Sequence, residues 1–351
     1  IGEGELALEE YCRRIMSKDD PCRSRGFWVK GPDGVIHKNP FADLIDINSL
    51  APLRYDLYHE KRLLRPMSGA IRRMLPLEVS RGCVYDCTFC ASPELKERYR
   101  GYGKWHRMKD VDLIDRDIST YISLYDPEYF FIISETFLAV ASSYFDRFVK
   151  MYGRYRIPFW MNTRPETIKD EYIGILKEIG LERMSIGVEC GNEKYRKEVL
   201  NRNYSNESLE NVFNICRKHD IKVSANVMIG LPDETREMIF DSIRLIKDLK
   251  PVSLGLCIFQ PYKGTRLYEY AARKGYVDRS RIVSNSIYEP VMTDSRISPK
   301  ELKKLLFTFN LYARLDESKW PLIDSIDMET VPGVSLFHDL VKQCSEICVS
   351  R

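Results

Sequence analysis

The stretch that decides the fold reads Ser80-Arg81-Gly82-Cys83-Val84-Tyr85-Asp86-Cys87-Thr88-Phe89-Cys90. Its three cysteines follow the spacing C-x3-C-x2-C. The apolar run Leu75-Pro76-Leu77-Glu78-Val79 lies just before them and predicts a short strand. The cysteines are therefore expected on a loop that leaves a strand end. Thiolates are soft ligands that select zinc or iron–sulfur clusters.

The choice between these metals depends on the number of ligands nearby. A structural zinc site requires four ligands. No fourth Cys or His lies close in the sequence, since the nearest His is His106 and Cys22 is far upstream. Three thiolates can hold three irons of a cubane and leave the fourth iron open. Cys83, Cys87 and Cys90 therefore favour an open iron–sulfur cluster over a zinc-stabilised binding module, and over three unrelated buried cysteines.

Composition narrows the class of partner and the compartment. Among 351 residues, 54 are Lys or Arg and 51 are Asp or Glu, which gives a net charge of +3. This balance does not indicate binding to nucleic acid or to an anionic membrane. Ten cysteines in a chain of this length fit a reducing cytoplasm better than a disulfide framework. No apolar run approaches the ~20 residues of a membrane span.

Strand and helix patterns alternate after the cysteine loop. Counting the strand before Cys83, six β–α units are expected, and repeated units of this kind imply a parallel sheet with right-handed crossovers. The fold class predicted is α/β, a partial (βα)6 TIM-like barrel over residues 76–275 that is open on one side. Functional residues should gather at the carboxyl ends of the strands. The later strands are expected at residues 129–133, 158–162, 183–188, 222–229 and 252–259.

The cysteine motif, with the aromatic Phe89 before its last cysteine, resembles the signature of the radical S-adenosylmethionine (SAM) superfamily. The string Ser-Arg-Gly-Cys-x3-Cys-Thr-Phe-Cys looks most like the members that carry an N-terminal cobalamin-binding domain. The resemblance covers roughly residues 1–275. It implies that a [4Fe–4S] cluster on Cys83, Cys87 and Cys90 binds SAM and cleaves it to a 5′-deoxyadenosyl radical. A small-molecule substrate and an electron donor such as flavodoxin or ferredoxin are implied as partners.

The resemblance also points to SAM-binding residues at the other strand ends. Glu135 follows the second strand and is expected to pair with the ammonium of the methionine moiety. Arg164 follows the third strand and has the fork geometry for the methionine carboxylate, although a surface salt bridge is an equal alternative. Glu189 follows the fourth strand, on the ribose or substrate side. Phe89 completes the expected cofactor contacts on the cysteine loop.

The fifth strand and the turn after it extend this expected site. Strand alternation puts Asn226 on the same face as Ser224 and Met228. Gly230 begins a turn that resembles the Gly-x-Pro-x-Glu-Thr stretch of the family, whose backbone would pack beside the adenine. Asp233 in this turn is expected to cap the next helix.

The chain opens on Gly2-Glu3-Gly4-Glu5 and a helical pattern. In the cobalamin-dependent members such a turn and helix close the cobalamin domain. Residues 1–18 are therefore expected to be a remnant of a Rossmann-like cobalamin-binding domain, with a hairpin and linker at 19–75 and an α-rich extension at 276–351. The D-x-H-x-x-G motif that ligates cobalamin in many members is absent. Cobalamin is thus expected only in a full-length parent protein.

The function implied is a radical SAM enzyme that methylates carbon or phosphorus in a small molecule with the help of cobalamin. A cobalamin-independent or non-methylating cyclase or oxidase is the alternative within enzymes, and the zinc-stabilised binding module is the alternative of another class. Three further cysteines are left without a role in this scheme. Cys190 is expected to be a buried thiol or a sulfur near the site, and Cys344 and Cys348 share one helix face.

Overall fold

The computed structural model describes residues 2–280, 288–293 and 296–349. Its centre is a seven-stranded sheet in the order β11-β10-β9-β8-β7-β4-β3. The strands from β4 to β11 in this sheet are parallel, and the edge strand β3 runs antiparallel to β4. These strands are β3 Leu64–Met67, β4 Ala70–Glu78, β7 Tyr129–Ile133, β8 Phe159–Thr163, β9 Leu181–Glu189, β10 Lys222–Ile229 and β11 Ser253–Ile258. The predicted partial barrel of six parallel strands is confirmed.

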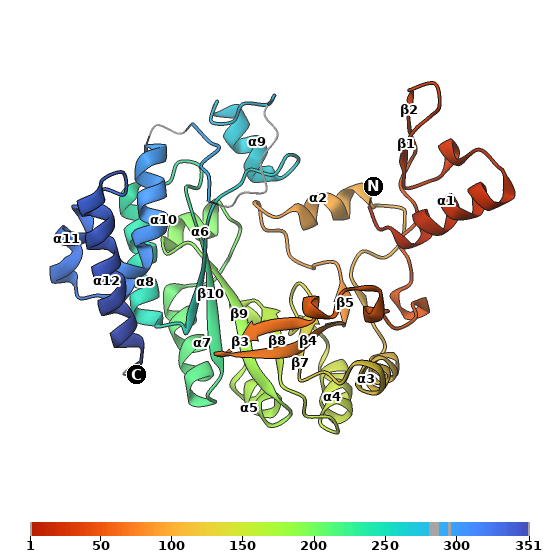
Figure 1. Cartoon of the computed structure of the whole chain (residues 1–351), viewed down its shortest axis with the longest axis horizontal. Coiled ribbons are helices and arrows are strands. Elements are labelled where there is room, and N and C mark those ends of the chain that lie inside the picture. The colour runs from red at the N-terminus through yellow and green to blue at the C-terminus, as the bar shows by residue number, and fades with distance from the viewer. Residues whose placement is uncertain (1, 281–287, 294–295, 350–351) are drawn as a thin grey trace.

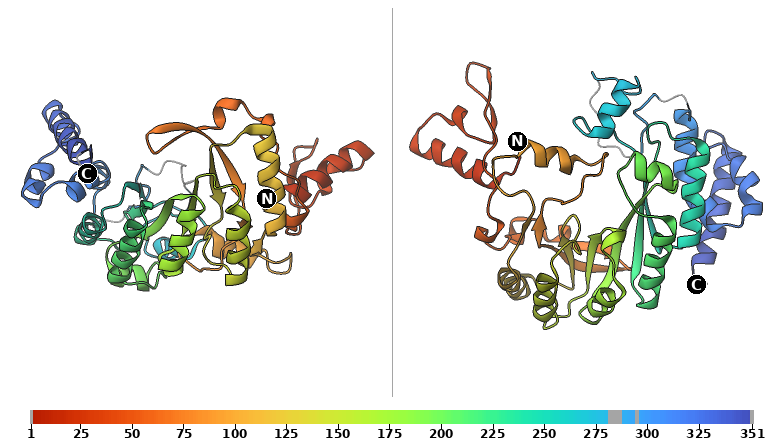
Figure 2. Two further views of the ribbon diagram at one scale, coloured as in Figure 1. Left: turned by 90° about the horizontal axis from the view of Figure 1, so that it is seen from below. Right: turned by 180° about the vertical axis from the view of Figure 1, so that it is seen from behind.

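Helices between the strands cover one face of the curled sheet (Figures 1 and 2). They are α3 Val111–Tyr125, α4 Ser142–Tyr152, α5 Asp170–Glu178, α7 Asn206–Lys218 and α8 Arg236–Leu249. Alternation along β10 explains this arrangement, because Val223, Ala225 and Val227 are buried toward the helices. Asn226 and its neighbours at i±2 point to the opposite side, as predicted. We call this opposite side of the sheet its inner face.

Several elements were not predicted. The strand expected at residues 75–79 is the second half of β4, which begins at Ala70 because its first residues pair with β3 as a hairpin. A short antiparallel pair, β5 Ser80–Arg81 and β6 Arg107–Met108, flanks the cysteine loop. Two short helices, α2 Ala91–Arg98 and α6 Glu193–Glu198, follow the cysteine loop and β9, respectively.

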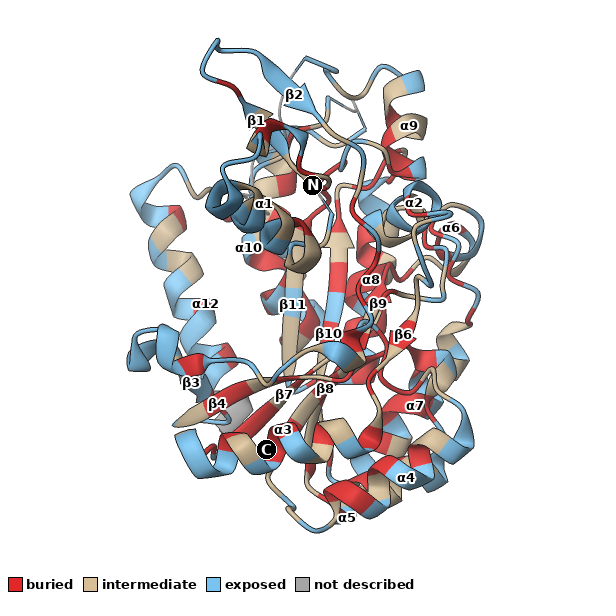
Figure 3. Cartoon of the chain, turned by 90° about the vertical axis from the view of Figure 1, so that its right-hand side faces the viewer, coloured by how far each residue is buried: buried red, intermediate tan, exposed pale blue. Residues whose placement is uncertain are grey.

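The N-terminal part lies to one side of the barrel (Figure 1). It contains α1 Glu5–Ser17 and the predicted hairpin, formed by β1 Trp28–Lys30 and β2 Ile36–Lys38. Among the residues of α1, Ala7 is buried and most of the others are exposed (Figure 3). Ion pairs fix the turn before α1, since Glu5 lies 2.6 Å from Arg81 and Glu3 accepts from Arg107 at 2.9 Å. The first turn is thereby anchored beside β5 and β6.

The C-terminal part is helical, as predicted. It packs on the far side of the barrel through α10 Pro299–Arg314, which lies against α8, and continues with α11 Trp320–Asp324 and α12 Val331–Val349. Phe309 and Tyr312 of α10 are fully buried. The indole N–H of Trp320 donates to the carbonyl of Tyr312 at 3.1 Å. Within the described residues, no helix is long and apolar enough to cross a membrane.

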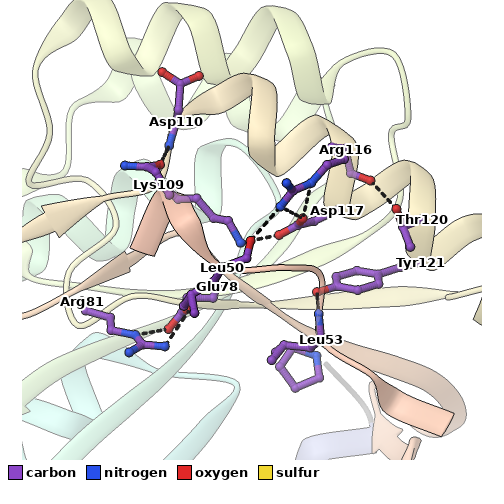
Figure 4. Close-up of polar contacts among 12 residues, drawn as sticks. Leu50, Leu53, Glu78, Arg81, Lys109, Asp110, Arg116, Asp117, Thr120 and Tyr121 are labelled. Atoms are coloured by element: carbon purple, nitrogen blue, oxygen red, sulfur yellow. Dashed lines mark hydrogen bonds and ion pairs between the residues drawn. The ribbon is translucent and has the colours of Figure 1, made fainter. Parts of the chain in front are cut away.

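The linker that leads into β3 is fastened to α3 (Figure 4). Arg116 donates to the carbonyl of Leu50 at 2.9 Å, and the backbone N–H of Leu53 donates to the hydroxyl of Tyr121 at 3.0 Å. Beneath the linker, Lys109 and Asp117 form an ion pair whose side chains are both almost fully buried. Arg116 contacts the same carboxylate of Asp117 at 2.9 Å.

The two partners of this buried pair should contribute unequally to stability. Asp117→Asn leaves the ammonium of Lys109 buried without a counter-charge, and we expect it to lower the free energy of unfolding by about 3 kcal/mol. Lys109→Met leaves Asp117 paired with Arg116 and should be clearly milder. Urea unfolding followed by circular dichroism measures both. Equal losses in the two variants would contradict this account of the pair.

Candidate functional site

The cysteine loop, residues 82–90, starts directly after β5. Gly82 has a φ of +82°, and a Cβ at this position would lie 2.4 Å from the carbonyl oxygen of Trp105. Only glycine combines this backbone angle with so close an approach. The N–H of Gly82 donates to the carboxylate of Glu135 at 3.2 Å. The beginning of the loop is therefore fixed by the segment after β7.

The end of the loop is held from the other side of the barrel. The hydroxyl of Thr88 donates to the carbonyl of Val199 at 2.6 Å, and the side-chain amide of Asn201 donates to the carbonyl of Asp86 at 2.8 Å. The N–H of Leu267, in α9 Arg266–Arg273, donates to the carbonyl of Thr88 at 2.9 Å. The segments that follow α6 and β11 therefore hold the end of the loop, whose beginning is held from the segment after β7.

The three cysteines differ in their surroundings. Cys87 is buried, whereas Cys83 and Cys90 are half-buried, and all three are free thiols. The sulfur of Cys87 accepts a hydrogen bond of 3.0 Å from the guanidinium of Arg164. The sulfur of Cys90 accepts from the N–H of Ser92 at 3.4 Å and so caps α2. Burial raises the pKa of the Cys90 thiol.

The loop is not arranged as a site for one metal ion. In the part of the chain that the structure describes, no three His, Cys, Asp or Glu side chains converge on a point where a single ion could bind. A closed zinc site needs four ligands at bonding distance from one ion. A cubane instead takes one thiolate on each iron. Three free thiols on one loop match the donor chemistry of such a cluster.

Arg164 lies at the end of β8 beside the cysteine loop. It is buried, and its guanidinium stacks 3.8 Å from the ring centre of Tyr85. The same group donates to the carboxylate of Glu166 at 2.5 Å and to Cys87. Arg164 thus lies beside Cys87, and its fork is directed at Glu166, with which it forms a salt bridge.

Glu189 lies at the end of β9 in a strained position. Its φ is +65°, which is uncommon for a residue other than glycine, and its side chain is buried. Burial raises the pKa of Glu189, and the guanidinium of Arg202 opposes this effect. The two side chains form an ion pair, and Arg202 also lies 5.6 Å from the ring centre of Phe89. Phe89 and Glu189, predicted separately, thus share one partner.

Arg202 is the site residue that the sequence analysis missed. It is 7% exposed, and within the described residues its Nε and Nη1 atoms have no hydrogen-bond partner. Buried donors of this kind are costly unless a ligand or water completes them. Arg202 lies in an irregular turn between α6 and α7 rather than after a strand. Its placement depends on the contacts of Val199 and Asn201 with the cysteine loop, which no sequence pattern reveals.

Asn226 and Gly230 lie on the neighbouring strand β10. Asn226 is exposed on the inner face, and a Cβ at Gly255 would lie 2.5 Å from its side-chain oxygen. Gly230 has a φ of +75°, and its N–H donates to the carboxylate of Glu234 at 2.6 Å. The N–H of Leu231 donates to the same oxygen at 3.0 Å. Gly230, just after β10, thus contacts the turn that precedes α8, and the side chain of Asn226 lies against Gly255 of β11.

Two further expectations concern this region. Asp233 does not cap α8, because the hydroxyl of Thr235 accepts from the backbone of that helix and Asp233 instead accepts from Tyr276 at 2.6 Å. Cys190 is fully buried in a small apolar cluster, and burial raises its pKa to about 12. Cys190 is thus buried, and Phe89 of the cysteine loop packs against the same cluster. Cys344 is also buried, and the side chain of Cys348 lies outside the described residues.

The close approach at Gly82 gives a matched test of the loop. Gly69, at the tip of the β3–β4 hairpin, has the same φ of +82° but open space around it. We expect Gly69→Ala to cost about 1 kcal/mol of unfolding free energy from backbone strain alone. Gly82→Ala should cost about 2 kcal/mol more, because its Cβ would clash with the backbone of Trp105. Urea unfolding of both variants measures the difference in unfolding free energy. Equal losses would contradict the close approach of Gly82 to the backbone of Trp105.

Glu234 gives a pH-dependent test. Burial raises its pKa to about 8 from a value of 4.5, so the folded protein keeps this carboxyl protonated below about pH 8. The unfolded chain releases the proton above about pH 4.5, and the free energy of unfolding therefore falls as pH rises between these values. Glu234→Gln cannot ionise. It should match the wild type at pH 5 and exceed its stability by roughly 3 kcal/mol at pH 7. A difference that does not change with pH would contradict this.

Comparison with known proteins shows which sequences this chain resembles. Residues 77–246 match the model of the radical SAM superfamily. The chain is 24% identical over 311 residues, 87% of its length, to an uncharacterised methyltransferase of Pyrococcus horikoshii. The chain spans 64%, 48% and 43% of the length of three of the curated relatives it matches.

Two solved structures share the fold. One is the cobalamin-dependent radical SAM enzyme OxsB with aqua-cobalamin bound, at a TM-score of 0.61 and 13% identity, covering 99% of this chain and 55% of that one. The other is the radical SAM methyltransferase TsrM of Kitasatospora setae with cobalamin and a [4Fe–4S] cluster bound. It gives a TM-score of 0.59 and 15% identity, covering 90% of this chain and 60% of that one. The match of residues 77–246 to the radical SAM superfamily is thus accompanied by the same fold in these solved structures.

Proposed function

We propose that this protein is a radical SAM enzyme whose Cys83, Cys87 and Cys90 hold a [4Fe–4S] cluster, and that it methylates a small molecule with the help of cobalamin. The observation that carries the first part is the cysteine loop itself. Three free thiols lie at the carboxyl ends of a parallel half-barrel and are positioned by backbone contacts from both sides of the barrel. The ends of parallel strands are where barrel enzymes place their chemistry.

The charges around the loop suit an anionic cluster. Arg164 donates directly to Cys87, and Arg202 lies beside Phe89 with two donor nitrogens unpartnered in the described structure. Positive guanidiniums stabilise thiolates and oppose their protonation. When bound, the cluster supplies the electron that cleaves SAM to the 5′-deoxyadenosyl radical. Cys83, Cys87 and Cys90 hold it and leave one iron for SAM.

The remaining predicted residues have distinct parts in binding SAM. Arg164 is already paired with Glu166, so we assign the methionine carboxylate to the open nitrogens of Arg202. Glu135 is exposed, and its Oε1 atom accepts from the N–H of Gly82. We assign its other carboxylate oxygen to the ammonium of SAM. Glu189 positions Arg202 through their ion pair. Asn226 and the turn at Gly230 line the strand end next to β9, where the nucleoside would lie.

The assignment to methyl transfer and to cobalamin rests on similarity to named proteins, the Pyrococcus methyltransferase, TsrM and OxsB. Cobalamin is part of this proposal as a cofactor of the full-length protein, because the solved structures of TsrM and OxsB have it bound. An electron donor such as flavodoxin or ferredoxin would reduce the cluster. Cyclisation or oxidation without cobalamin is the competing reaction, and it leaves the roles of the cysteines unchanged.

The cluster assignment is tested by anaerobic reconstitution with iron and sulfide. We expect an absorbance band near roughly 400 nm, bound iron, and cleavage of SAM to 5′-deoxyadenosine when a reductant is added. Cys87→Ala should lose the band and reduce 5′-deoxyadenosine below detection. Cys12→Ala is the control, because Cys12 is exposed on α1 and away from the loop. A Cys87→Ala protein that still cleaves SAM would refute the assignment.

Methyl transfer is read out in the same reaction. SAM labelled on its methyl group should label a product only when the protein also contains cobalamin. Formation of 5′-deoxyadenosine with no transfer of the methyl label in the presence of cobalamin would favour the competing cyclisation or oxidation.

A further inference from the structure

A cavity of about 570 Å³ lies on the inner face of the sheet, over β3, β4, β7 and β8. Its floor consists of Met74 and Pro76 of β4, Phe131 of β7 and Trp160 of β8. The rings of Phe131 and Trp160 lie 4.7 Å apart. Sites for small molecules have volumes of about 300 to 1,000 Å³ and mostly apolar linings. This cavity has the size and the lining of such a site.

The cavity lies on the same face as the proposed cofactor residues. Trp160 and Arg164 are four residues apart on β8 and its continuation, so alternation places them on one side of the sheet, about 13 Å apart. Pro76 of β4, which lines the cavity, and Ser80 of β5, which precedes the cysteine loop, are also four residues apart. A molecule that fills the cavity would therefore extend along the inner face toward the strand ends.

The outer wall of the cavity is preformed. It is built by the linker. The hydroxyl of Tyr55 donates to the carbonyl of Pro76 at 2.5 Å. The ring of Tyr55 also packs against the ring of Tyr121, with ring centres 5.3 Å apart. The hydroxyl of Tyr121 also holds the backbone of Leu53, which lines the cavity (Figure 4). The wall is thus fastened to α3 and does not depend on an occupant.

Two guanidiniums at the cavity have no counter-charge. Arg62 and Arg65 line it, no acidic residue does, and neither arginine forms an ion pair among the described residues. Two nearby arginines are paired, Arg54 with Asp56 at 2.6 Å and Arg73 with Asp126 at 3.7 Å. Arg65 also lies directly opposite Arg72 in the β3–β4 hairpin, and like charges at such positions are unfavourable. An anion bound at the cavity would relieve this repulsion.

The mouth of the cavity is apolar. Leu53 and Tyr58, which line it, are 49% and 57% exposed. Exposed apolar groups that gather at one place mark binding sites. We propose that the cavity binds a small apolar, ring-bearing molecule with a negatively charged group, and that molecules of this class are the substrates of the radical SAM reaction. The second half of this inference rests on the function proposed above.

The binding half is tested with the aromatic anion 8-anilinonaphthalene-1-sulfonate. We expect it to bind the wild-type protein and to show emission sensitised by Trp160. Trp160→Phe should remove most of this sensitised emission. Arg65→Gln should weaken binding about fivefold, as expected for the loss of one solvent-exposed charge contact. Lys61→Gln is the matched control, because it removes the same charge from an exposed neighbour that does not line the cavity.

Two competitors test the chemical class. Naphthalene-2-carboxylate should displace the probe, whereas the uncharged 2-naphthamide should do so at least several-fold less well, and the difference should shrink in Arg65→Gln. Equal affinity of wild type and Arg65→Gln for the probe, or sensitised emission that survives Trp160→Phe, would show that the anion binds elsewhere. Either result would overturn the inference.

This failure can be told apart from failure of the proposed function. The probe assay needs neither cluster nor SAM, and Cys87→Ala should bind the probe like the wild type. A protein that cleaves SAM but does not bind the probe at Trp160 retains its proposed function and refutes the cavity assignment. A protein that binds the probe as expected but does not cleave SAM refutes the proposed function and, with it, the claim that the occupant is the substrate.

Discussion

The hydrogen bonds that hold the cysteine loop are the constraint on which the rest of the site depends. Three thiols on a surface loop act together only if the backbone between them is fixed, since loops are otherwise mobile. Gly82 is held from the β7 side, and Thr88 is held from α9, which follows β11 at the other end of the sheet order. The loop therefore spans the top of the half-barrel. Its geometry is set by the curl of the sheet and not only by its own sequence.

Charge at this end of the barrel follows from the same arrangement. The segment after α6 is drawn onto the loop by Val199 and Asn201, and this brings Arg202 between Phe89 and Glu189. The carboxylate of Glu189 neutralises part of that guanidinium, while among the residues that the structure describes two of its nitrogens have no hydrogen-bond partner. A buried arginine with open donors is expensive in an isolated fold and becomes favourable once an anionic partner binds. The unpartnered donors of Arg202 thus favour the binding of an anion at this site.

The sequence predicts the frame of the barrel well because its strands are buried on the helix-covered face and bounded by clear helix patterns. The strand at 129–133 coincides with β7, and the one at 222–229 with β10. The β3 strand was missed because Pro66 argues against a strand and is tolerated here only at a sheet edge. Asp233 was assigned as a cap from its position, but a tyrosine far along the chain, Tyr276, binds it instead.

The cysteines, Phe89, Arg164 and Glu189 could be proposed as candidates from motif and strand order, since parallel strands end at one edge. Arg202 could not, because its position depends on long-range hydrogen bonds to the loop. The same holds for the cavity, whose wall comes from a linker that carries no periodic pattern. What the sequence lacks in both cases is information on which irregular segments lie against which strands.

The inner face is divided into two unlike halves, and the division limits what can bind there. Near β4, β7 and β8 it is apolar and aromatic, whereas near β9 to β11 it is polar, with Arg183 donating to Ser224 and Ser253 at 2.9 Å. Trp160 marks the boundary, because its indole N–H donates to Ser185 at 3.0 Å. Arg183 directs one of its nitrogens at these two serines. Arg62 and Arg65 line the cavity beside the apolar half, so a molecule matched to that half must combine an apolar body with a negative charge.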